Sequence, residues 1–156
     1  MSLKVGEKAP GFTLVDTEKK EHTLAEFAGK KTILAFYPGA FTGVCTKEMC
    51  SFRDSLANFN SINAQIVGIS VDSPFANKAF AAVNGITYPL LSDVTHAVSK
   101  AYAGLFENFA GVKGYTASNR AVFILDAQGV VRYAWVGENP GVEPNYDEVA
   151  AALKAA

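Results

Sequence analysis

The chain has 156 residues, of which 49% are hydrophobic and 19% charged, and this composition excludes a disordered chain. Its 14 basic and 15 acidic side chains give a formal net charge of −1, so it lacks the basic excess of many nucleic-acid-binding proteins. No apolar run approaches the length of a membrane-spanning helix, and the N-terminus lacks the apolar core of a secretion signal. We therefore expect a single domain over residues 1–156, located in the cytoplasm, that binds neither nucleic acid nor membrane.

The predicted strands are short segments rich in apolar residues and bounded by turn residues. The first two flank a charged turn and predict an N-terminal β-hairpin, and the next two are continuously apolar, as in strands buried on both faces. The last two are separated by an Asp-Ala-Gln-Gly turn and predict a second hairpin. In chain order, the six strands cover residues 12–14, 22–24, 31–37, 65–71, 121–125 and 130–136.

Helical patterns fill the intervals between these strands. Ser73 followed by Pro74 is typical of a helix start, because serine caps the first turn and proline fits the first helical position. The predicted helices cover residues 44–59, 74–83, 96–102 and 146–154. This order predicts an α/β fold in which helices flank a mixed central sheet, and a thioredoxin-like arrangement fits it.

One apolar stripe runs along the helix predicted at residues 44–59. At about 100° per residue its members fall within roughly 40° of one line, and they are Cys45, Met49, Phe52, Leu56 and Phe59. Cys45 therefore lies in the first turn of a helix that starts at the C-terminal edge of a buried strand, where α/β sheets concentrate their functional sites. Free backbone N–H groups and the helix dipole favour a nucleophilic thiolate there. The stripe alone is also consistent with Cys45 being a small buried apolar residue that has no catalytic role.

Thr42 and Pro38, which both precede Cys45 in the chain, strengthen the catalytic interpretation. Thr42 occupies the place of a helix N-cap, whose side chain would reach the third residue of the helix, and its hydroxyl could also contact a thiolate and a bound substrate. Pro38 ends the strand and has no N–H, so it would shape the pocket and keep water from the sulfur. Each residue also has a purely structural interpretation, as a cap and as a strand terminator.

The spacing Pro-x-x-x-Thr-x-x-Cys on a strand, loop and helix resembles the active-site motif of the peroxiredoxins, here Pro38, Thr42 and Cys45. Other segments resemble landmarks of the same family in the same order, so that the resemblance extends over essentially the whole chain. These segments are residues 5–14, 71–74, 89–93 and 118–120.

The resemblance implies a thioredoxin-like domain that reduces hydrogen peroxide and organic hydroperoxides with no metal or organic cofactor. Cys45 would be the peroxidatic cysteine, which attacks a peroxide oxygen and becomes a sulfenic acid. Thr42 and the Cys45 backbone N–H would donate to the peroxide, and Arg120 would favour the thiolate and polarise the peroxide. Glu48 matches a position that orients this arginine. From the pattern alone, Arg120 also fits a solvent-exposed charge at the end of a strand. Glu48 also fits an acidic residue in the first turn of a helix, where it interacts favourably with the helix dipole.

Cys50 bears on the subtype. The sequence Cys-Thr-Lys-Glu-Met-Cys resembles the bacterioferritin-comigratory-protein type, or Q type, whose resolving cysteine lies five residues on, whereas residues 37–45 resemble the alkyl hydroperoxide reductase E type, often with one catalytic cysteine. Five residues on an intact helix are about 7.5 Å of rise apart, and a disulfide needs Cα atoms within about 7 Å. A Cys45–Cys50 bond would therefore require the first turns to unwind, which Gly39 and Gly43 would ease. We favour this intramolecular disulfide, and resolution by an external thiol stays open.

Other classes of site fit less well. A thioredoxin-type oxidoreductase requires Cys-x-x-Cys, whereas residue 48 is glutamate. A metal site built from Cys45, Cys50, His22 and His96 would have a spacing that matches no ligand pattern. A redox sensor or a holdase on the same fold would use the same cysteine without turnover.

The partners follow from the resemblance. It implies peroxide substrates and a thioredoxin- or glutaredoxin-type reductant, because the oxidised cysteine must be returned by a thiol. A homodimer is compatible with it. Phe41 and Phe106 are candidates for the rim of the peroxide pocket.

Overall fold

The two continuously apolar segments form the centre of the sheet. In the computed structural model, which describes residues 2–156, β3 (Lys31–Phe36) pairs in parallel with β4 (Ala64–Ser70). On its other edge β3 pairs antiparallel with β8 (Ala121–Leu125), which places Phe36 opposite Ala121. These strands are almost completely buried, as expected for strands covered on both faces.

The whole sheet has seven strands in the order β2–β1–β5–β4–β3–β8–β9. The pairing of β1 (Thr13–Val15) with β2 (Glu21–Thr23) confirms the N-terminal hairpin, and the pairing of β8 with β9 (Val131–Val136) confirms the second. β5 (Leu90–Ser92) pairs in parallel with β4 and is a strand that the sequence did not predict. Its three buried residues are too few to show an alternating pattern.

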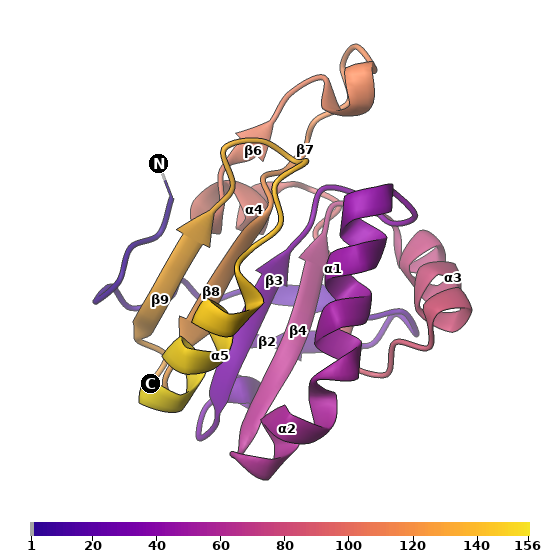
Figure 1. Ribbon diagram of the computed structural model, residues 1–156. Coiled ribbons are helices and arrows are strands. Elements are labelled where there is room, and N and C mark those ends of the chain that lie inside the picture. The colour runs from indigo at the N-terminus through magenta and orange to yellow at the C-terminus, as the bar shows by residue number, and fades with distance from the viewer. Residues whose placement is uncertain (1) are drawn as a thin grey trace.

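A second, two-stranded sheet consists of β6 (Leu105–Phe106) and β7 (Ala117–Ser118). The chain between them carries the 3₁₀ turn η2 (Phe109–Gly111) and projects beyond the end of the central sheet, above α1 and β3 in Figure 1. Neither strand was predicted, because two residues carry no periodic signal.

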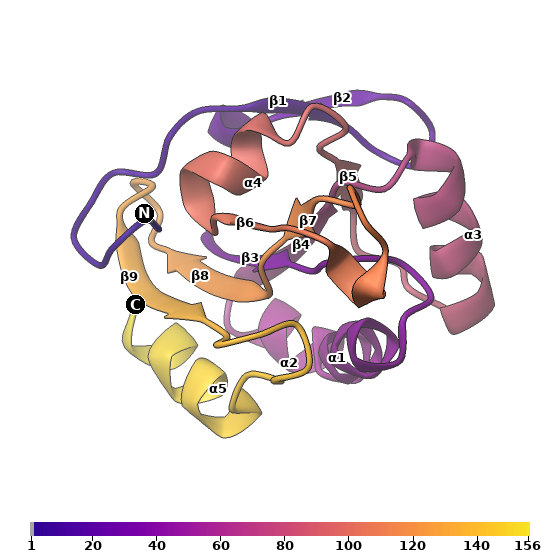
Figure 2. The same ribbon diagram turned by 90° about the horizontal axis from the view of Figure 1, so that it is seen from above.

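Helices cover both faces of the central sheet. Figure 2 shows α1, α2 and α5 on one face, α4 on the face that lies toward the N-terminal hairpin, and α3 beside the β5 edge. No helix in the described part of the chain is long and apolar enough to cross a bilayer. In chain order the helices are η1 (Leu24–Phe27), α1 (Gly43–Asp54), α2 (Leu56–Ser61), α3 (Pro74–Asn84), α4 (Ala97–Tyr102) and α5 (Tyr146–Ala155).

The prediction of a single helix over residues 44–59 is wrong in one respect, because the observed helix is broken at Ser55. The Ser55 N–H donates to the Phe52 carbonyl at 3.1 Å, three residues back, and α2 then starts in a new direction. Phe52 and Phe59 stay buried in the same core, whereas Leu56 is only partly buried. No proline or glycine marks the break, and after it α2 packs against β4.

Candidate active site

A strand, a buried loop and a helix start position Cys45. β3 ends at Phe36, and Pro38 and Gly39 continue the chain below the surface. The backbone reverses at Phe41, whose φ of 65° lies in the left-handed region, and α1 begins at Gly43. Cys45 is consequently in the first turn of α1, as predicted, and its exposed fraction is 0%. The site is therefore closed to bulk water in this conformation.

Thr42 is at the N-cap position of α1, but the predicted capping bond is wrong. Its hydroxyl donates to the Gly39 carbonyl at 2.7 Å and accepts no helix N–H. The Thr42 carbonyl accepts from the Thr46 N–H at 2.9 Å, which is the first bond of the helix. The N–H groups of the first turn thus have no side-chain cap and remain available beside Cys45.

Arg120 is buried against Cys45. Its exposed fraction is 2%, which excludes the solvated strand-end charge considered above. Nη2 donates to the Cys45 Sγ at 3.1 Å, and Nη1 donates to Glu48 Oε1 at 3.0 Å. Nε and Nη2 also donate to the Pro140 carbonyl, at 3.0 and 2.8 Å. The planar guanidinium is held on three sides, which fixes its charge beside the sulfur.

Glu48 lies one helical turn beyond Cys45 and is fully buried. Burial raises the pKa of its carboxyl to about 7, although Arg120 opposes the shift. Oε1 accepts from Arg120, whereas the buried Oε2 has no hydrogen-bond partner. The structure thus brings Glu48 into contact with Arg120 and away from the solvated start of the helix.

Comparisons with known proteins identify the family of this chain. Residues 5–134 match the AhpC/TSA family. Alkyl hydroperoxide reductase E of Mycobacterium tuberculosis is 42% identical over 135 residues, which cover 85% of this chain and 84% of that protein. This chain belongs to the AhpC/TSA family, the peroxiredoxins. Homologues and structural neighbours of this peroxiredoxin are peroxidases, and the enzyme is assigned to the same class.

Two solved structures support the assignment of the peroxiredoxin fold. Peroxidoxin BcpB from Mycobacterium tuberculosis superposes with a TM-score of 0.84 at 31% identity, covering 98% of this chain and 97% of that one. The bacterioferritin comigratory protein of Xanthomonas campestris also gives 0.84 at 31% identity, with 99% and 98% covered. The thioredoxin-like fold predicted from the sequence is thereby confirmed. Both subtypes named above are represented among the similar proteins.

Cys50 points away from Cys45. Its Sγ lies 3.7 Å from Asn84 Oδ1 at the end of α3, and the residue is half-buried. Both thiols are free, and α1 is continuous through both positions. The structure therefore shows this peroxiredoxin with the helix intact, the state from which any Cys45–Cys50 bond would have to start.

Three contacts of the site were not found from the sequence. The Pro140 carbonyl, the Phe109 ring and the Tyr115 hydroxyl come from loops with no periodic signal. Phe109 and Tyr115 lie 3.2 and 3.4 Å from the place that a Cβ on Gly39 would occupy, so the glycine permits their close approach. Of the two rim candidates, Phe41 is exposed beside Thr42, and Phe106 lies partly buried in β6.

The two histidines form hydrogen bonds with residues outside the site around Cys45. His22 bonds Asp16 and Glu26, and His96 bonds the Thr116 carbonyl. Over residues 2–156, no group of three or more His, Cys, Asp or Glu side chains is arranged to hold a metal ion.

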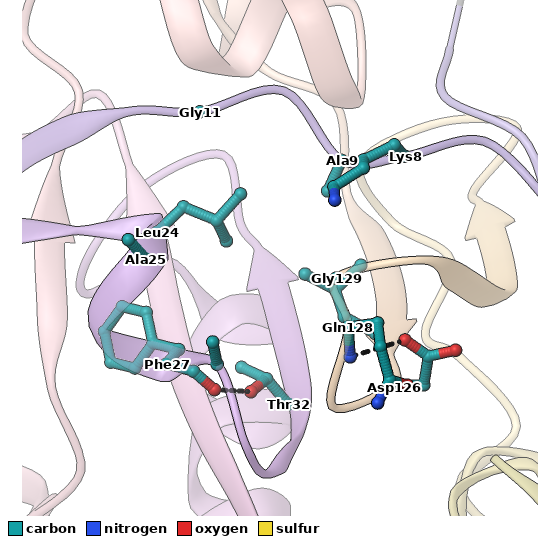
Figure 3. Close-up of a pocket in the computed structure, with 12 residues that line it drawn as sticks. Lys8, Ala9, Gly11, Leu24, Ala25, Phe27, Thr32, Asp126, Gln128 and Gly129 are labelled. Carbon is teal, nitrogen blue, oxygen red and sulfur yellow. Dashed lines mark hydrogen bonds between the residues drawn. The ribbon is translucent and has the colours of Figure 1, made fainter.

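A mainly apolar cavity of about 370 Å³ lies at the other end of β3 and β8. Figure 3 shows Leu24 and Phe27 on one side of it and Asp126 and Gln128 on the other. It is lined by Thr32, which pairs with Leu125, whereas the site described above is at the Phe36 end of β3. The cavity is therefore separate from Cys45.

Proposed function

We propose that this peroxiredoxin reduces hydrogen peroxide and organic hydroperoxides through Cys45. The thiolate attacks one peroxide oxygen, a sulfur–oxygen bond forms and the oxygen–oxygen bond breaks. The sulfur is oxidised to a sulfenic acid, and the other oxygen takes a proton and leaves as water or an alcohol. The observation that carries the proposal is the 3.1 Å contact between Arg120 Nη2 and the Cys45 Sγ in a buried site.

Each neighbour has a role in this reaction. Arg120 offers a fixed positive charge to the thiolate and to the stretching peroxide bond, where charge develops in the transition state. The backbone N–H of Cys45 and the hydroxyl of Thr42 donate to the peroxide oxygens once Thr42 exchanges its bond to Gly39. Pro38 is buried under the loop and excludes water. Glu48 holds Arg120 in place through Nη1.

Resolution of the sulfenic acid involves Cys50 in our proposal. The two cysteines lie on opposite sides of an intact helix, so the disulfide requires the first turns of α1 to unwind. The left-handed φ of Phe41 just before the helix is a strained feature that unwinding would relieve. An external thiol that attacks Cys45 directly is the alternative. In either case a thioredoxin- or glutaredoxin-type thiol reduces the oxidised enzyme back to its thiol form.

The same cysteine chemistry bears on the cellular compartment of the enzyme. A reducing compartment keeps Cys45 and Cys50 as thiols, so we retain the cytoplasmic location. The single domain over residues 1–156 and the homodimer also remain predictions.

Peroxide consumption and intact mass test the proposal together. Cys45→Ser should abolish peroxide consumption, since no other thiol contacts Arg120 in the described structure. One equivalent of hydrogen peroxide should remove two hydrogens from the wild-type chain, with the link mapped to Cys45 and Cys50. In Cys50→Ser, the product should instead be one oxygen on Cys45.

The outcomes separate the alternatives. An added oxygen on Cys45 of the wild-type chain, with Cys50 untouched, would favour resolution by an external thiol. Substantial peroxidase activity in Cys45→Ser would rule out Cys45 as the peroxidatic residue.

A further inference from the structure

Three ionisable groups occupy one closed space at the start of α1. Arg120 lies 3.1 Å from the Cys45 Sγ and 3.0 Å from Glu48 Oε1, and none of these residues is more than 2% exposed. One cation thus lies between two groups that can each carry a negative charge. In a buried site, a second anion beside a single cation is left uncompensated, and its ionisation is disfavoured.

The remaining surroundings of Glu48 do not supply that compensation. Glu48 Oε2 is buried and has no hydrogen-bond partner. Lys47 is paired with Glu143 at 3.2 Å, near the surface, and Glu143 opposes the ionisation of Glu48. Burial raises the pKa of Glu48 to about 7 against the effect of Arg120. The other titratable groups coupled to it are the phenols of Tyr37, Tyr88 and Tyr146.

We propose that Cys45 and Glu48 share a single negative charge, so that oxidation of Cys45 transfers this charge to Glu48 with loss of the Glu48 proton. The inference rests on the proposed function and adds to it a statement of which group carries each proton and charge. In the reduced site Cys45 is a thiolate, Arg120 a cation and Glu48 a neutral carboxylic acid.

The reaction balances on these terms. Thiolate and hydroperoxide give an uncharged sulfenic acid and an alkoxide or hydroxide, with two electrons passing from sulfur to the peroxide bond. The leaving oxygen takes up one proton, and Glu48 releases one. Arg120 then faces the Glu48 carboxylate in place of the thiolate, so the charge of the buried site is the same before and after. Glu48 is thus a positioning residue that acts on the reaction through Arg120.

Infrared difference spectroscopy at neutral pH tests the inference, because it detects the carbonyl stretch of a protonated carboxylic acid. Reduced Cys50→Ser enzyme, in which oxidation stops at the sulfenic acid and α1 stays intact, should show this band for one buried carboxyl per chain, and one equivalent of hydrogen peroxide should diminish it. Glu48→Gln should lack the band in both states. Cys45→Ser lacks the competing anion, so Glu48 should lose its proton at a lower pH than in the reduced wild-type enzyme, and the band should fade at that lower pH without any peroxide.

The controls keep this inference separate from the proposed function. If mass spectrometry shows an oxidised Cys45 and the band is unchanged, the shared charge is wrong while the peroxidase proposal stands. A band that fades at the same pH in Cys45→Ser as in the reduced wild-type enzyme has the same meaning, and that comparison needs neither peroxide turnover nor the Glu48→Gln variant. Failure of peroxide to oxidise Cys45 in the wild-type chain would instead contradict the proposed function.

Discussion

At the scale of single residues, the contacts of Arg120 account for the choice of arginine. Its guanidinium donates at the same time to a sulfur, a carboxylate and a backbone carbonyl. Lysine keeps the positive charge but places it at one point on a flexible chain, so it cannot satisfy Cys45, Glu48 and Pro140 together. The geometry of the guanidinium, as well as its charge, determines the site.

Arg120→Lys should therefore slow the oxidation of Cys45 by hydrogen peroxide by about 10²-fold, the usual effect of removing one donor to a developing charge. The rate is measured by stopped-flow spectroscopy on reduced protein. Arg132→Lys is the matched control, because the Arg132 side chain is 53% exposed and pairs with Asp126. Equal rates in the wild-type and Arg120→Lys enzymes would mean that charge alone is sufficient.

At the scale of elements, the N-terminal hairpin is held by His22. This side chain lies between Asp16, at 2.6 Å, and Glu26 of η1, at 2.8 Å, and stacks on Phe27. Burial disfavours the charged histidine, but the two carboxylates outweigh it and raise the pKa of His22. The pKa values of Asp16 and Glu26 are lowered by the same contacts, against the effect of burial, which is the largest influence on Asp16.

The sign of the pH effect follows from these shifts. A raised pKa of His22 adds stability below its unfolded value, and this stability is lost as the pH rises through the folded pKa. The lowered carboxyl pKa values add stability that is lost as the pH falls through them. His22→Gln should consequently reduce the free energy of unfolding most near about pH 5, by about 1 kcal/mol, and less above neutrality.

Urea denaturation across this pH range measures the effect. Asp16→Asn should remove part of the same pH dependence, since it deletes the shorter of the two contacts of His22. Stability curves of wild type and His22→Gln that run parallel at every pH would contradict the role of this contact.

At the scale of the whole molecule, the site depends on how closely α1 approaches the sheet. Gly68 in β4 lies opposite Leu90 of β5. A Cβ at this position would be 2.6 Å from Leu90 Cδ2, 3.3 Å from the Tyr37 ring and 3.6 Å from the Met49 Sδ. The missing side chain therefore lets β5, the end of β3 and α1 meet at one point of the core.

Gly68→Ala should destabilise the protein by about 1–3 kcal/mol, the typical cost of overpacking a close-packed interior. Thermal unfolding followed by circular dichroism measures this change. Gly11→Ala is the matched control, because a Cβ at Gly11 would have no atom within 4 Å. A melting temperature for Gly68→Ala equal to that of the control would show that the core adjusts without cost.

Local sequence patterns account for the features that depend on neighbouring residues. Ser73 accepts from the Ala76 N–H at 3.1 Å and caps α3, as Ser-Pro predicts. Both hairpins and the two central strands follow from local periodicity and turn residues. The position of Cys45 in the first turn of α1 follows in the same way. These features were predictable because the pattern that marks each of them lies within a short stretch of the sequence.

The surroundings of Cys45 depend on contacts between distant parts of the chain. Arg120 is 75 residues from Cys45 in the chain, and the register that places Phe36 opposite Ala121 brings the two together. The direction of Cys50 likewise depends on a contact with Asn84 of α3, 34 residues along the chain. The sequence determined where Cys45 lies on its helix, and the long-range pairing of β3 with β8 determined which charge lies beside it.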